Sequence, residues 1–183
     1  MTTDAAMRYH PNGFTLYELL LTMTLLAIIA GLALPSFEKI IANGRLRTEV
    51  DALFHAIHLA RQESVVRRQV VSICPSLDGT SCTASLDWSD GWIMFNNLDR
   101  DDPPGRDPGE ALLQAHRTDS AVRISANRRG FTLRSTELRA TNGTIVVCDP
   151  AGRVTPRALV VSYTGRPRVT LADTRGNPYR CAD

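Results

Sequence analysis

The sequence lacks the short patterns that most often accompany catalysis. Its 183 residues contain no Gly-x-Ser-x-Gly nucleophile elbow, no glycine-rich phosphate loop and no His-Glu-x-x-His metal motif. None of the four histidines has an evident triad partner; they are His10, His55, His58 and His116. His55 and His58 are three residues apart, but no third ligand is evident near them, so they are expected on a helix surface. The sequence therefore argues against an enzyme and predicts neither catalytic residues nor a cofactor.

Lysine is almost absent as well. Lys39 is the only lysine, so the other twenty of the 21 basic residues are arginines. A codon bias toward arginine accounts for this ratio but not for the distribution of charge. Residues 78–119 hold nine acids and three arginines, whereas residues 121–183 hold eleven arginines and four acids. The C-terminal third is thus basic, and arginine in particular binds phosphate through a planar, two-pronged contact.

One long apolar run stands near the start of the chain. It covers the 21 residues from Phe14 to Leu34, and Glu18 is the only acidic or basic residue in it. A helix of this length can cross a bilayer. A charged group at membrane depth costs about 2.5 kcal/mol or more, so Glu18 is expected to have a partner and a function.

The small residue before the apolar run distinguishes this segment from a secretory signal. A secretory signal has its small-residue cleavage site after the apolar stretch, but here Gly13 comes directly before Phe14. Gly13-Phe14-Thr15-Leu16, with Glu18 as the fifth residue after Gly13, resembles type IV pilins and pseudopilins. The resemblance implies that prepilin peptidase cleaves after Gly13 and that Phe14 is then N-methylated. It also implies that Glu18 pairs with the N-terminal amine of a neighbouring subunit, whereas a plain signal anchor has no use for such a glutamate.

This resemblance divides the chain into four parts. Residues 1–13 form the leader, which is nearly neutral, and Met7 is an alternative start that would make it shorter and basic. Residues 14–35 form the half of a long helix that lies in the inner membrane and later in the filament core. Residues 36–68 form its amphipathic half, and residues 69–183 form a globular domain on the periplasmic side. A kink or local melting is expected near Gly31 and Pro35, because proline removes a helical hydrogen bond.

The second half of the helix is expected to face the globular domain. Apolar residues recur there at helical spacing, at Phe37, Ile40, Ile41, Val50, Leu53, Phe54 and Ile57. Basic residues in the last turns complement the helix dipole, and these are Arg61, Arg67 and Arg68.

Four cysteines follow the apolar run, on the side of the membrane where disulfides form. No Cys-x-x-Cys pair is present, which argues against zinc or any other metal site. Three pairings are possible. The favoured one joins Cys74 to Cys82, which closes a short loop, and Cys148 to Cys181, which ties down the C-terminus.

Beyond Arg68 the sequence changes to short β-strands separated by turns. Seven segments read as strands: 70–74, 92–95, 121–124, 131–133, 144–148, 159–163 and 168–171. Residues 96–110 form an acidic loop whose spacing does not match a calcium-binding EF-hand. Trp88 and Trp92 are expected in a core or an interface rather than as base-stacking platforms. The expected fold class is α+β, with the long helix packed on antiparallel β-structure.

The globular region resembles the FimT/GspH group of minor pilins and pseudopilins. The residues that carry this resemblance are Leu59-Ala60-Arg61-Gln62-Glu63-Ser64, Ile73-Cys74-Pro75-Ser76 and Asp87-Trp88 before Gly91-Trp92-Ile93-Met94-Phe95. Near the C-terminus, Gly165-Arg166-Pro167-Arg168 resembles the Gly-Arg-x-Arg motif with which FimT-type minor pilins bind DNA in natural transformation.

The chemistry of the motif agrees with this resemblance. Gly165 suits a tight turn, and in an extended strand Arg166 and Arg168 point to the same side, about 7 Å apart. The motif predicts a pilus subunit that binds double-stranded DNA of any sequence and that contacts prepilin peptidase and other pilins. Further arginines that would widen the surface are Arg153, Arg157, Arg175 and Arg180. The alternative is a structural subunit without DNA binding, either a GspH-like pseudopilin of type II secretion or a minor pilin that primes pilus assembly.

Overall fold

The computed structural model describes residues 13–135 and 140–181, with the side chains of residues 32–35 left aside. The leader residues 1–12, and with them the alternative start at Met7, lie outside the described residues. The chain divides into two compact units, Met1–Glu38 and Lys39–Asp183. The first contains the apolar half of the long helix α1 (Leu16–Arg67), and the second contains the rest of the helix and the β-strands.

The start of α1 is a capping box. The Thr15 Oγ1 atom accepts a hydrogen bond from the Glu18 N–H at 3.2 Å, and Glu18 Oε2 accepts one from the Thr15 N–H at 3.0 Å. Helical structure continues through Gly31 and Pro35, so the local melting expected from the sequence does not occur. The kink at these residues stays a prediction. The apolar half of α1 is long and apolar enough to cross a membrane.

The second half of α1 supplies one wall of the core. Its buried residues recur three and four apart, at Ala42, Leu46, Val50, Leu53, Ala56, Ile57 and Ala60. Three residues that the sequence assigned to this face are exposed instead: Phe37, Ile40 and Ile41 are 61%, 67% and 54% exposed. That part of the prediction is wrong, because Ala42 is the first buried residue among the helix residues whose side chains are described.

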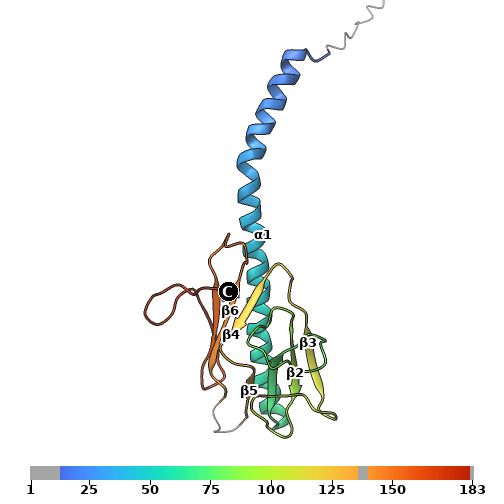
Figure 1. Ribbon diagram of the computed structural model, residues 1–183, viewed down its shortest axis with the longest axis vertical. Helices are drawn as coiled ribbons and strands as arrows, with labels where there is room; N and C mark the ends of the chain where they lie inside the picture. Colours follow the sequence, from blue (N-terminus) through green and yellow to red (C-terminus); the bar gives the residue numbers. More distant parts are fainter. Residues whose placement is uncertain (1–12, 136–139, 182–183) are drawn as a thin grey trace, which may run out of the picture. The chain divides into compact units, whose positions relative to one another are not determined.

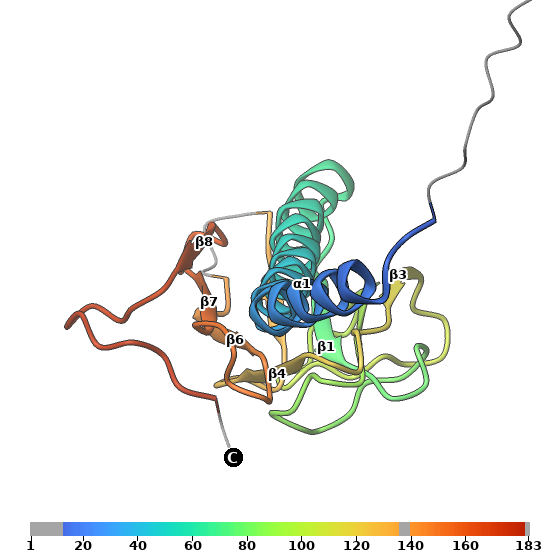
Figure 2. The ribbon, with the colours of Figure 1, turned by 90° about the horizontal axis from the view of Figure 1, so that it is seen from above.

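The described strands form two four-stranded sheets, and every pairing in them is antiparallel. One sheet has the order β3-β2-β1-β5, with bounds Leu112–His116, Trp92–Asn96, Val71–Pro75 and Phe131–Leu133. The other has the order β4-β6-β7-β8, with bounds Arg123–Ala126, Gly143–Cys148, Arg157–Val161 and Pro167–Thr170. Figure 1 shows the strands beside the lower part of α1, and Figure 2 shows β7 and β8 on one side of this part and β1 and β3 on the other.

A single apolar cluster joins α1 to both sheets. It contains Leu53 and Ile57 of the helix, Ile73 of β1 and Leu159 of β7, each at most 1% exposed. Trp88 and Trp92 are fully buried, which confirms their expected place in the core. Close packing between the helix and the sheets makes the second unit a rigid base for its surface loops.

Polar contacts and disulfides fix the connections around this core. Buried Glu49 on α1 accepts hydrogen bonds from His116 Nε2 at 2.9 Å and from the Asp119 N–H at 3.0 Å. Disulfides join Cys74 to Cys82 and Cys148 to Cys181, which is the pairing that the sequence favoured.

The acidic loop after β2 uses its carboxylates to hold its own backbone. Asp101 Oδ2 accepts from the Gly105 N–H at 2.7 Å, and Glu110 Oε1 accepts from the Leu98 N–H at 2.6 Å. Within the described residues, no group of three or more acids, histidines or cysteines is arranged to hold a metal.

Candidate nucleic-acid interface

The Gly-Arg-x-Arg motif begins in the turn between β7 and β8. The Gly165 N–H donates to the Ser162 carbonyl oxygen at 2.9 Å, and the Ser162 N–H donates to the Arg166 carbonyl oxygen at 3.1 Å. Gly165 has a φ of 69°. This combination is the three-residue hairpin loop in which a left-handed residue follows a tight turn. The hairpin expected from the sequence is therefore present, with both arginines at the start of its second strand.

Gly165 also packs so closely against its neighbours that a side chain at this position would displace them. A Cβ atom at this position would lie 2.9 Å from Leu133 Cδ1 and 3.4 Å from the Ala140 Cβ atom. Leu133 belongs to the other sheet and is fully buried. The turn is thus held against the core by close contact as well as by its own hydrogen bonds.

Arg166 and Arg168 lie on the exposed side of the hairpin. The intervening Pro167 is buried and pairs with Val161, whereas both arginines are exposed. This alternation agrees with the prediction that the two arginines share a face. Within residues 13–135 and 140–181, neither guanidinium takes part in an ion pair. Their charge is therefore available to an external anion.

Arg166 also lines a groove with the end of α1. The groove has a volume of about 640 Å³, and its lining includes His58, Arg61, Gln62 and Glu63 of the helix. The Arg61 Cδ atom lies 3.8 Å from the point that a Cβ on Gly165 would occupy. The helix end and the hairpin are therefore in immediate contact.

Arg153 and Arg157 are at the opposite end of the same sheet and already have structural partners. Arg153 donates from Nη2 and Nε to the two carboxylate oxygens of Asp149, at 2.7 and 2.9 Å. These hydrogen bonds lower the pKa of buried Asp149 to about 2. Arg157 donates from Nη2 to Asn43 Oδ1 of α1 at 3.0 Å. The structure does not bring these two arginines to the hairpin turn.

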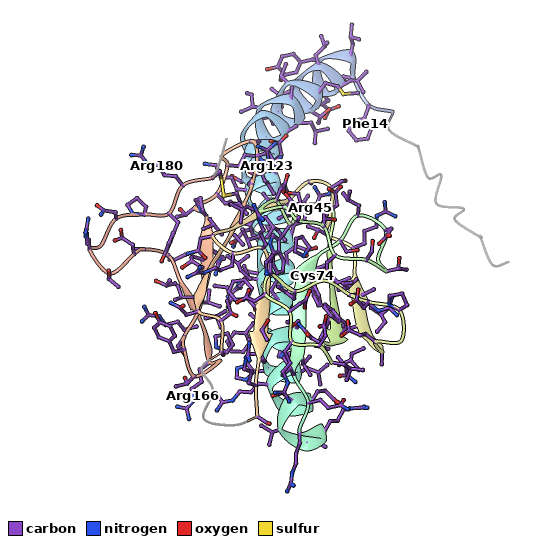
Figure 3. The ribbon with its side chains drawn as sticks, turned by 60° about the horizontal axis from the view of Figure 1, so that its bottom comes forward. Phe14, Arg45, Cys74, Arg123, Arg166 and Arg180 are labelled. Atoms are coloured by element: carbon purple, nitrogen blue, oxygen red, sulfur yellow. A yellow bond between two sulfur atoms is a disulfide. The ribbon has the colours of Figure 1, made fainter. Side chains whose placement is uncertain are left out.

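Arg175 and Arg180 are in the C-terminal segment after β8. This segment leaves the sheet at Thr170, which pairs with Ala158 near the start of β7, and so at the end remote from the turn. Figure 3 shows Arg166 and Arg180 at opposite ends of the domain. Arg175 and Arg180 are exposed, but they do not extend the surface around Arg166.

Other arginines, which the sequence did not assign to the motif, lie close to the turn. Arg128 follows β4 and donates from Nε to the Asn142 carbonyl oxygen at 3.1 Å, just before β6 begins. The first residue of β6, Gly143, pairs with Val161 at the edge of the turn. Arg134 directly follows Leu133, which contacts Gly165. The proximity of these arginines to the turn follows only from the strand pairing.

Phe14 and Glu18, the N-terminal residues with predicted roles, are both exposed. Phe14 is 83% exposed, and Glu18 is exposed and bonded to Thr15 of its own chain. The fold, the apolar first turns of α1 and the acid at Glu18 together define a pilin-like subunit.

Comparison with protein families identifies the group. Residues 49–165 match the model for "Type II transport protein GspH", and residues 9–34 match the prokaryotic N-terminal methylation motif. The chain therefore belongs to the GspH family and is a minor pilin or pseudopilin of a type IV pilus or a type II secretion system. No curated protein sequence matches it significantly.

Solved structures with the same fold come from both systems. The type IV minor pilin FimU of Pseudomonas aeruginosa aligns with 76% of this chain and 97% of its own, at 19% identity and a TM-score of 0.52. The minor pseudopilin EpsH from the type 2 secretion system of Vibrio cholerae aligns with 69% and 96%, at 8% identity and a TM-score of 0.50. These similarities establish the α+β fold. They do not distinguish a type IV pilus from a type II secretion system, so that distinction has to come from the chain's own surface.

Proposed function

We propose that this chain is a FimT-like minor pilin that binds extracellular double-stranded DNA for uptake in natural transformation. Gly165, Arg166 and Arg168 form the binding site. The observation that carries the proposal is the pair of exposed arginines on a rigid hairpin, neither of them in an ion pair within the described residues.

The geometry suits the phosphate backbone rather than the bases. Two guanidinium groups on one face of an extended strand are about 7 Å apart, close to the spacing of successive phosphates. The turn offers no long element that would enter a groove and read base edges. Binding is therefore independent of sequence and falls as salt rises, by about 12-fold between 50 and 200 mM for two phosphate contacts.

The N-terminal segment supports a filament as the location of this activity. Prepilin peptidase cleaves between Gly13 and Phe14, Phe14 is N-methylated, and the apolar half of α1 holds the subunit in the inner membrane with its domain in the periplasm. On assembly into an extracellular pilus, Glu18 pairs with the N-terminal amine of a neighbouring pilin. The match to the methylation motif supports this path. Glu18 in a membrane or filament core also requires such a partner.

The test is a gel-shift assay with the full-length chain in a non-ionic detergent. Arg166→Gln combined with Arg168→Gln is expected to remove most of the DNA retention. Arg175→Gln combined with Arg180→Gln removes the same net charge at the other end of the domain and is expected to keep it. Equal retention by the two double variants would refute the proposed site.

The second candidate is a structural pseudopilin of type II secretion, or a minor pilin that only primes assembly. The family description and the fold shared with EpsH favour it. Glu18→Ala separates assembly from binding, because it is expected to impair filament incorporation and to spare DNA retention by the purified chain. Loss of both would show that the two roles are not divided between the two ends of the chain.

A further inference from the structure

The groove between the end of α1 and the hairpin turn carries a second inference, which rests on the proposed DNA binding. We propose that the last turns of α1 form a second wall of the DNA interface and that Arg61 contacts a phosphate there. Arg61 lines the groove together with Arg166, and its Cδ atom approaches the Gly165 backbone. The motif itself contains no helix residue, so this wall is a separate contribution to binding.

The position of Arg61 follows from the helix period. Ile57, Ala60 and Ser64 are buried, so Arg61 lies at the border of the buried face and is half-buried. His58, three residues before Arg61, and Gln62, four residues after His58, are exposed and line the same groove. The alkyl stem of Arg61 rests against the hairpin, and its charged head is left to the groove.

The charge of this groove fits a polyanion. Within the described part of the chain, Glu63 is the only acid in its lining, and Arg67 neutralises it through a hydrogen bond from Nε to Oε2. Among the described residues, Arg61 has no ion-pair partner, and the same holds for Arg166. Two uncompensated arginines on separate rigid elements are suited to the regularly spaced phosphates of a DNA strand.

A contact from Arg61 changes the measured salt dependence in a defined way. Each neutralised phosphate contributes about −0.9 to the slope of log K against log salt. Two contacts from the hairpin give a slope of about −1.8, and a third from α1 gives about −2.7. Between 50 and 200 mM salt the affinity then falls about 42-fold instead of about 12-fold.

The experiment compares three variants of the full-length chain in non-ionic detergent, by fluorescence anisotropy with a labelled DNA duplex across a salt series. Arg61→Gln is expected to weaken binding about threefold or more and to reduce the slope by about 0.9. Arg47→Gln removes one exposed arginine from the same helix, 14 residues earlier and about 21 Å away along the axis, and is expected to change neither. Arg61→Lys keeps the charge and the alkyl stem, so it is expected to bind DNA better than Arg61→Gln. That result would show that misfolding does not cause the loss in Arg61→Gln.

The outcomes separate this inference from the function on which it rests. If the Arg166 and Arg168 double variant loses DNA but Arg61→Gln behaves like Arg47→Gln, the helix wall is refuted and the hairpin site stands. If neither variant differs from the unmodified chain, both proposals are refuted. If Arg61→Lys is as weak as Arg61→Gln, the effect is structural and the phosphate contact is refuted.

Discussion

Replacement of Gly165 by alanine tests whether the hairpin turn is held rigidly against the core. Gly165 has a φ of 69°, a left-handed conformation that costs an L-residue about 1 to 2 kcal/mol. The new Cβ would also lie 2.9 Å from Cδ1 of buried Leu133, which must then shift. Overpacking of this kind costs about 1 to 3 kcal/mol. We therefore expect Gly165→Ala to lower the free energy of unfolding by about 2 to 5 kcal/mol.

Gly176 provides a matched control within the same chain. Its N–H donates to the Asp173 carbonyl oxygen at 3.1 Å in a similar turn, and its φ is 83°. Apart from its two chain neighbours, no atom of the described residues lies within 4 Å of the place where its Cβ would be. Gly176→Ala should therefore show only the backbone cost of about 1 to 2 kcal/mol. Urea denaturation followed by the fluorescence of Trp88 and Trp92 measures both variants. Equal losses in the two variants would refute the close contact at Leu133.

Three further predictions concern the stability of the domain. The pKa of Asp149 is about 2 in the folded chain and about 3.9 when unfolded, so its bonds to Arg153 contribute on the order of 2 kcal/mol above pH 5, and this is lost as the pH falls toward 2. Asp149→Asn should therefore flatten the acid limb of a plot of Tm against pH, and an unchanged limb would contradict the assignment. Loop entropy predicts a loss of about 3.7 kcal/mol on removal of the Cys148–Cys181 bridge, which spans 33 residues, and about 2.5 kcal/mol for the Cys74–Cys82 bridge, which spans 8. Chemical denaturation of the two double Cys→Ala variants should give this order, and the reverse order would contradict it. Glu49→Ala leaves the His116 ring and the Asp119 N–H without their acceptor and should cost about 2 to 4 kcal/mol by the same assay, whereas a loss below about 1 kcal/mol would show that water replaces the carboxylate.

Local patterns were sufficient to predict the features that depend on neighbouring residues. The apolar run with Glu18 predicted the start of α1, and Gly165 predicted the hairpin because its turn requires a positive φ. The two-residue period of a strand predicted that Arg166 and Arg168 lie on one side, and both are exposed. Each of these inferences uses geometry within a few residues.

Features that depend on partners far away in the sequence were missed. Strand β3, with the sequence Leu-Leu-Gln-Ala-His, has no β-branched residue and lies at a sheet edge, so its pairing with β2 is not visible from composition. Phe37, Ile40 and Ile41 fit the helical period, but the period does not say where the covering sheets begin. The approach of Arg61 to Gly165 joins residues about a hundred positions apart, and only the packed fold brings them together.

The central claim is that the hairpin end of the domain binds the DNA backbone through arginine, and an equilibrium salt titration tests it most directly. The full-length chain in non-ionic detergent is titrated against two duplexes of unrelated sequence, between about 50 and 200 mM salt. The account predicts equal affinities for the two duplexes and a slope of log K against log salt at least as steep as about −1.8. Absence of binding at the lowest salt, a slope near zero or a strong preference for one duplex would contradict it.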